Sequence, residues 1–68
     1  MSCIEAGKLK VGDIIFETSP FASTPKICEV VKIETSGKES VKITAKIRDG
    51  NLFQIRRRKT TVIMLATQ

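Results

Sequence analysis

The alternation of apolar and polar positions is strictest between Val41 and Arg48, in the segment VKITAKIR. Side chains on a β-strand point alternately to its two faces, so this period of two predicts a half-buried strand with one face in water. No window of useful length shows the 3.6-residue period of a helix. The pattern therefore predicts an all-β chain.

Shorter apolar runs, separated by glycine, proline and serine, divide the chain into five predicted strands. They cover residues 14–18, 27–34, 40–48, 52–59 and 61–65. The stretch 19–25 is predicted to be a loop, because its two prolines interrupt a regular ladder. This arrangement predicts a small five-stranded SH3-like barrel. We expect one domain over residues 1–68, with an approach segment at 1–10 and the barrel at 11–65.

The lengths of the turns decide how neighbouring strands pair. A two-residue turn at Asp49-Gly50 would place Arg56 opposite Ile43 in the core, whereas a three-residue loop keeps both apolar sets on one face. We therefore expect three-residue loops at 49–51 and 36–38. The resulting pairs are Ile47 with Phe53, Ala45 with Ile55, Ile33 with Val41 and Val31 with Ile43.

These registers predict a row of like charges on the outer face of the sheet, formed by Lys32, Lys42 and Arg58. Like charges directly opposite one another destabilise a sheet, by up to roughly 1 kcal/mol per pair. We therefore expect this face to meet an anion. The neighbouring outward rows are predicted to be Val30, Thr44 and Arg56, then Cys28, Lys46 and Gln54.

The net charge of +5 and the pI near 9.6 agree with an anionic partner. Segment 42–59 alone contains seven basic residues and one acidic residue, Asp49. Such a charge also keeps a small domain soluble, and the run 56–59 is also consistent with protection of the apolar strand that follows it. Both interpretations remain open at this point.

The candidate phosphate-binding residues are the outward-facing cations and two at the margin. The outward set is Lys32, Lys42, Lys46, Arg56 and Arg58, and the marginal pair is Arg48 and Arg57. Alternation along the fourth strand sends Arg57 and Lys59 to the inward side, at a rim. Phe21, in the loop, is a candidate for stacking on a base or, alternatively, for capping the end of the barrel.

The sequence lacks the residue combinations that most enzymes use for catalysis. The chain has no histidine and two cysteines, which cannot supply a usual four-ligand zinc site. The carboxylates are scattered, and Asp13 and Asp49 beside glycines are predicted to form turns. Cys28 lies in the apolar run ICEVV and is predicted to act as a small hydrophobe. We expect no enzyme activity, no cofactor and no metal.

No apolar run approaches the roughly 18 residues of a membrane span, and the N-terminus lacks the order of a signal peptide. The cysteine usage is typical of a reducing compartment, so we expect a cytoplasmic protein without a membrane partner.

Several short motifs resemble the KOW domain of the bacterial transcription elongation factor NusG. They are Gly12-Asp13-Ile14-Ile15, then Pro20-Phe21-Ala22, then the segment 29–34 (EVVKIE), followed by the alternating third strand. A weaker similarity links Lys8 to Gly12 and Gly37-Lys38 to the N-terminal domain of elongation factor P and of translation factor 5A. These resemblances imply an accessory role in transcription or translation, where such domains bind nucleic acid or the surfaces of polymerase and ribosome.

The sequence thus predicts a non-enzymatic nucleic-acid-binding barrel, with DNA and RNA both open. The alternative is a protein-interaction module that docks on polymerase, ribosome or another acidic protein surface. A third possibility is pairing of the strand 61–65 with another copy, so we expect a monomer or a weak homo-oligomer.

Overall fold

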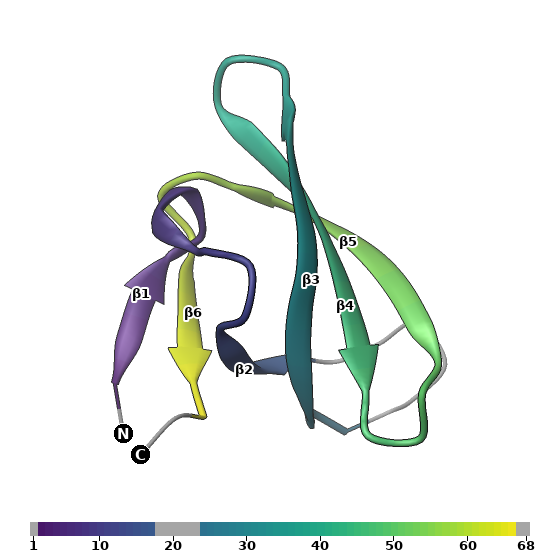
Figure 1. Cartoon of the computed structure of the whole chain (residues 1–68). Helices are drawn as coiled ribbons and strands as arrows, with labels where there is room; N and C mark the ends of the chain where they lie inside the picture. Colours follow the sequence, from purple (N-terminus) through teal and green to yellow (C-terminus); the bar gives the residue numbers. More distant parts are fainter. Residues whose placement is uncertain (1, 18–23, 67–68) are drawn as a thin grey trace.

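The computed structural model describes residues 2–17 and 24–66 of the chain. In this part the chain forms one antiparallel sheet of six strands, in the order β1-β6-β2-β3-β4-β5 (Figure 1). The prediction of an all-β chain is confirmed. The strands are β1 (Cys3–Glu5), β2 (Ile14–Glu17), β3 (Lys26–Ser36), β4 (Ser40–Ile47), β5 (Leu52–Arg58) and β6 (Val62–Leu65).

The prediction of a closed five-stranded barrel is wrong. The additional strand is β1, which lies in the expected approach segment and pairs with β6, Ile4 opposite Ile63. In the described residues the two edge strands, β1 and β5, share no ladder, so the sheet stays open. The other five strands begin and end within two residues of their predicted bounds.

A 3₁₀ turn, η1 (Ala6–Lys8), lies between the two edges. The Ala6 and Gly7 amides donate hydrogen bonds to the carbonyl oxygens of Thr61 (2.8 Å) and Lys59 (2.9 Å). A Cβ on Gly7 would lie 2.9 Å from the Lys59 Cβ, which is too close for a real contact. Glycine therefore permits η1 to pack on the β5–β6 connection.

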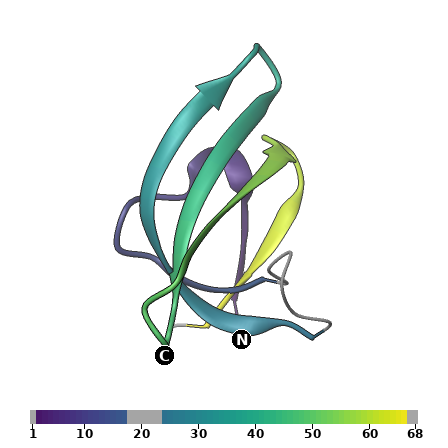
Figure 2. The ribbon, with the colours of Figure 1, turned by 90° about the vertical axis from the view of Figure 1, so that its right-hand side faces the viewer.

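Figure 2 shows the strong coil of the sheet. The apolar core of the described residues lies on its inner side. Both the central strands and η1 contribute to it, and Ala6, Ile15, Val30 and Ile43 have no exposed surface. The β3–β4 hairpin extends beyond the rest of the sheet in both views (Figures 1 and 2). Among residues 2–17 and 24–66 the buried hydrophobic side chains are Ala6, Leu9, Ile15, Cys28, Val30, Val41, Ile43, Ala45, Phe53, Ile55 and Ile63.

The β4–β5 hairpin has a three-residue loop, as predicted, but at residues 48–50 instead of 49–51. Ile47 bonds Asn51 across the turn, and Gly50 adopts a left-handed φ of 97° that favours glycine. The predicted pairs are therefore wrong by two residues: Phe53 lies opposite Ala45, and Ile55 lies opposite Ile43. A shift of two leaves every side chain on its predicted face.

The β3–β4 register is also wrong, because the loop comprises residues 37–39 and Ser36 pairs with Ser40. Ile33 lies opposite Ile43, and Val41 lies opposite Thr35. In addition, a β-bulge interrupts the pairing between Val30 and Lys32. Because the bulge adds one residue to β3, the side chains on its N-terminal side point to the face opposite to the predicted one. Cys28 and Val30, which were predicted to face outward, are therefore buried in the core.

Candidate nucleic-acid interface

The observed registers replace the predicted row of three cations with mixed rows. Lys42 lies between Glu34 on β3 and Arg56 on β5. Arg58 lies opposite Ser40, one row nearer the tip of the hairpin. The predicted row of Lys32, Lys42 and Arg58 is thus wrong, and Lys42–Arg56 is the like-charge pair that these rows retain.

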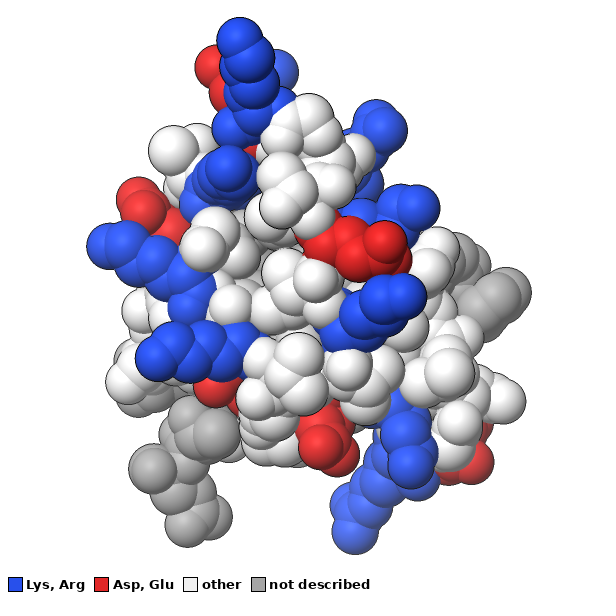
Figure 3. All heavy atoms as spheres, turned by 45° about the horizontal axis from the view of Figure 1, so that its top comes forward, with Lys and Arg blue, Asp and Glu red and all other residues white. Residues whose placement is uncertain are grey.

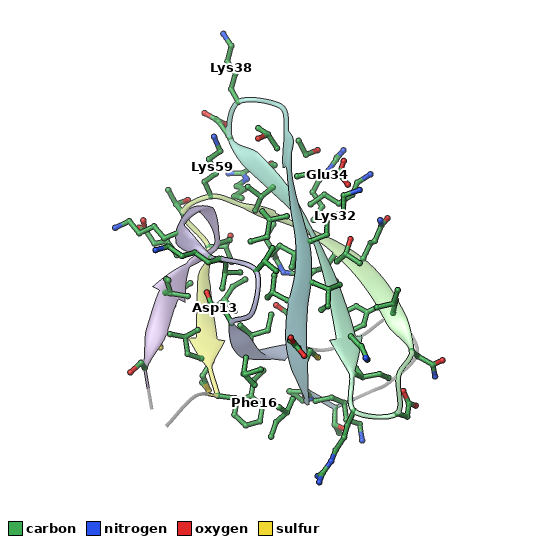
Figure 4. All side chains as sticks on the ribbon, in the orientation of Figure 1. Asp13, Phe16, Lys32, Glu34, Lys38 and Lys59 are labelled. Atoms are coloured by element: carbon green, nitrogen blue, oxygen red, sulfur yellow. The ribbon has the colours of Figure 1, made fainter. Side chains whose placement is uncertain are left out.

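Lys32 is partly neutralised by its neighbour on the same strand. Its Nζ lies 3.6 Å from Glu34 Oε1, and the two side chains are 64% and 48% exposed (Figure 4). An exposed ion pair of this kind contributes little to stability, typically about 0–1 kcal/mol. It does, however, place a carboxylate beside two of the predicted phosphate ligands, Lys32 and Lys42.

Three cations, Lys38, Arg58 and Lys59, meet where the β3–β4 turn approaches the end of β5. The Lys59 amide donates a 2.7 Å hydrogen bond to the Glu39 carbonyl oxygen, which holds the two segments together. A hollow of about 330 Å³ opens between them. It is lined by Lys38, Glu39, Arg58, Lys59 and Thr60.

We call the five cations of this region the basic end: Lys38, Lys42, Arg56, Arg58 and Lys59. Figure 4 shows Lys38 projecting from the β3–β4 turn, with Lys59 below it. In Figure 3, which brings this end forward, Lys and Arg side chains spread over the surface with single acidic side chains between them. The sequence did not place Lys38 and Lys59 among the candidate binding residues, because only the fold brings the turn at 37–39 to the end of β5.

Lys46 and Arg48 do not belong to the basic end. Lys46 lies four residues from Lys42 along β4, or about 13 Å in an extended strand, and faces Glu29 and Leu52 on its neighbours. Arg48 lies in the β4–β5 turn, at the opposite end of the hairpin from Lys38. The structure therefore divides the predicted binding residues into two groups.

The Arg57 side chain forms an ion pair on the inner side of the sheet. Its Nη2 lies 3.1 Å from Glu17 Oε1, and the two side chains are 33% and 15% exposed. Its Nη1 also donates to the Arg56 carbonyl oxygen at 2.9 Å. Arg57 thus joins β5 to β2 across the inner side of the sheet, as the predicted inward orientation implies.

The aromatic residues have different positions. Phe53 is buried in the core, as predicted, and Phe16 lies partly buried at the end of the molecule opposite Lys38 (Figure 4). Phe21, the candidate for base stacking, lies outside the described residues.

Asp13 and Asp49 form turns, as predicted. The Asp13 carboxylate accepts a hydrogen bond from the Lys10 amide (2.8 Å), and the Asp49 carboxylate accepts one from the Asn51 amide (2.9 Å). In the described part of the chain, no group of three or more Cys, Asp or Glu side chains is placed to hold a metal ion. No helix in residues 2–17 and 24–66 is long and apolar enough to cross a membrane.

Cys28 packs as a small hydrophobe, with 1% of its surface exposed. Burial raises the pKa of its thiol, and the negative charge of Glu17 raises it further. Because the thiolate is the nucleophilic form, this environment suppresses the reactivity of Cys28.

Comparison with known proteins finds no match to a family model, to a curated protein sequence or to a solved structure. The resemblance to KOW domains therefore rests on the short motifs of the sequence.

Proposed function

We propose that this chain is a non-enzymatic nucleic-acid-binding domain whose basic end contacts the phosphate backbone. The observation that supports the proposal best is the hollow lined by Lys38, Arg58 and Lys59, with Glu39 as its single acidic residue. The like-charge pair Lys42–Arg56 lies beside Arg58 on the same face. Lysine and arginine that neutralise phosphates release counterions, which favours binding at low salt.

The proposed contact is to the backbone and not to the bases. Every residue of the basic end is a cation, and phosphate contacts position a protein on nucleic acid without reading its sequence. We therefore expect DNA and RNA to bind with little sequence preference. An accessory role in transcription or translation follows from the resemblance to KOW domains and belongs to the same proposal.

The direct test is fluorescence anisotropy with labelled duplex DNA, single-stranded DNA and single-stranded RNA at about 50 and 200 mM salt. If four or five phosphates are neutralised, affinity should fall about a hundredfold between these conditions. No binding at low salt, or binding that does not change with salt, would contradict the proposal.

A matched pair of double variants locates the site. Arg56→Glu/Arg58→Glu should weaken binding by about tenfold or more at the lower salt concentration. Lys46→Glu/Arg48→Glu changes the net charge by the same amount at exposed positions toward the opposite end of β4 from Lys38, and should have a much smaller effect. Equal losses in the two variants would show that total charge, and not the basic end, governs binding.

A further inference from the structure

The outer face of the sheet contains a second hollowed region, at the opposite end from Lys38. Two adjoining hollows, of about 440 and 500 Å³, share Ile27, Ile47 and Arg48 in their lining. We call them together the groove. Cavities of this size are typical of sites that take up part of a ligand or peptide.

The floor of the groove is apolar. Ile14 and Phe16 on β2 lie opposite Glu29 and Ile27 on β3, and all four side chains belong to the outer face because Ile15 and Cys28 between them are buried. Ile27 is 52% exposed, and Leu52, which pairs with Lys46 next to the groove, is 57% exposed. A cluster of exposed apolar side chains that is surrounded by charged side chains is typical of a surface that another molecule covers.

The rim carries three cations, Lys26, Lys46 and Arg48. None of them takes part in the ion pairs between described residues. The lining also contains two carboxylates, Glu29, which lies opposite Lys46, and Asp49, so its formal charge is +1. The electrostatic balance of the rim therefore favours a negatively charged occupant.

We propose that the groove binds a short acidic peptide segment of another protein. Its apolar side chains would cover Ile14, Ile27 and Phe16, and its carboxylates would meet Lys46 and Arg48. A second copy of this chain fits poorly, because the net charge of +5 opposes its approach to a basic rim. The inference does not depend on nucleic-acid binding, because it uses different residues at the other end of the sheet.

The test uses three nine-residue peptides and the ¹⁵N-labelled full chain. The first has three glutamate-leucine-glutamate repeats, the second replaces glutamate with lysine, and the third replaces leucine with serine. Only the first should shift the amide resonances of Ile14, Ile27 and Lys46. If the serine peptide shifts these resonances as much as the first peptide does, the apolar floor contributes nothing to binding. If the lysine peptide shifts them as much, the cations of the rim contribute nothing. Either result, or no shifts at these residues, would overturn the proposal.

Matched variants separate the groove from general effects on the surface. Ile27→Ser and Arg48→Glu should each weaken the leucine-glutamate peptide about tenfold. Val62→Ser, at a 62% exposed position on β6, and Lys10→Glu should change the affinity by less than about twofold. Retention of the ¹⁵N spectrum confirms that each variant folds. Equal losses in the groove variants and their controls, or self-association through Ile27, would contradict the assignment.

Discussion

The basic end and the groove occupy the same sheet and differ mainly in what lies between their charges. At the basic end the rows across β3, β4 and β5 are polar throughout, as in Glu34–Lys42–Arg56. In the groove, cations surround apolar side chains such as Ile27, which is 52% exposed. Cations on a polar surface suit phosphate groups, whereas cations around an apolar floor suit a partner that buries apolar side chains as well.

The β-bulge at Val30/Lys32 marks the change between the two regions. Without it, the alternation along β3 would carry Cys28 and Val30 to the outer face and Ile27 to the core. The extra residue buries Cys28 and Val30 and exposes Ile27. One inserted position thus converts a regular amphipathic strand into two regions with different surface chemistry.

The largest expected effect concerns the core that both regions share. Ile43 is fully buried beneath β4, and Ile43→Ala should lower the free energy of unfolding by about 2–5 kcal/mol. Such a loss is comparable to the whole stability of a domain of this size, so both binding activities should disappear together. Urea denaturation followed by circular dichroism measures it. Val62→Ala, at an exposed position, should change stability by less than about 0.5 kcal/mol. A similarly small change for Ile43→Ala would contradict the described core.

Neighbouring arginines should give opposite results. Arg57→Gln removes one interaction partner of the partly buried Glu17 and should cost about 1–2 kcal/mol of stability, with nucleic-acid affinity almost unchanged. Arg58→Gln should leave stability within about 0.5 kcal/mol but lower affinity about threefold and reduce the salt slope by about one. Denaturation and anisotropy on both variants provide the comparison. If Arg57→Gln weakens nucleic-acid binding as much as Arg58→Gln does, the Arg57 side chain faces the ligand, and the assignment of its ion pair with Glu17 is wrong.

The carboxylate beside the basic end should oppose binding. Glu34 lies next to Lys32 and opposite Lys42, so Glu34→Gln should raise nucleic-acid affinity about two- to threefold at low salt. Glu29→Gln, which faces Lys46 near the groove, should have a smaller effect on the same measurement. Anisotropy titrations at about 50 mM salt test both. A larger gain from Glu29→Gln would move the nucleic-acid site toward the groove.

The smallest expected effect is a pH dependence that arises beneath the groove. Burial raises the pKa of the Cys28 thiol, so the folded state retains its proton where the unfolded chain has lost it. This contribution to stability is complete below the unfolded pKa and is lost as pH rises through the folded pKa. Denaturation at pH 8 and pH 10 should therefore show a smaller decline in Cys28→Ala than in the wild type. Cys3→Ala, at an exposed position, is the control and should decline like the wild type.

The alternation in 41–48 was sufficient to predict β4, because burial on one face of a strand leaves a period of two in the sequence. The same reasoning predicted β2, β3, β5 and β6 within two residues. It missed β1, because three residues with a single partly buried side chain, Ile4, carry no detectable period. Pairing with β6 alone makes Cys3–Glu5 a strand.

The candidate site was predicted less completely than the fold. Lys32, Lys42, Arg56 and Arg58 face outward as expected, but the rows that they form depend on the position of each turn. Moving the β3–β4 loop by a single position placed Glu34 opposite Lys42, where Lys32 was expected. The sequence contains glycines near both turns, and the choice between neighbouring three-residue loops depends on the backbone conformation at Gly37 and Gly50.

By itself, the sequence determined the all-β class, the strands with a strong period and the excess of positive charge. These properties depend on local alternation and on composition. The tertiary structure alone decided the register, the bulge, the internal partner of Arg57 and the open edge beside η1. Each of these depends on residues that are distant in the chain and on the packing of one strand against another, so no local pattern contains them. The separation of the cations into the basic end and the groove is therefore a property of the folded sheet.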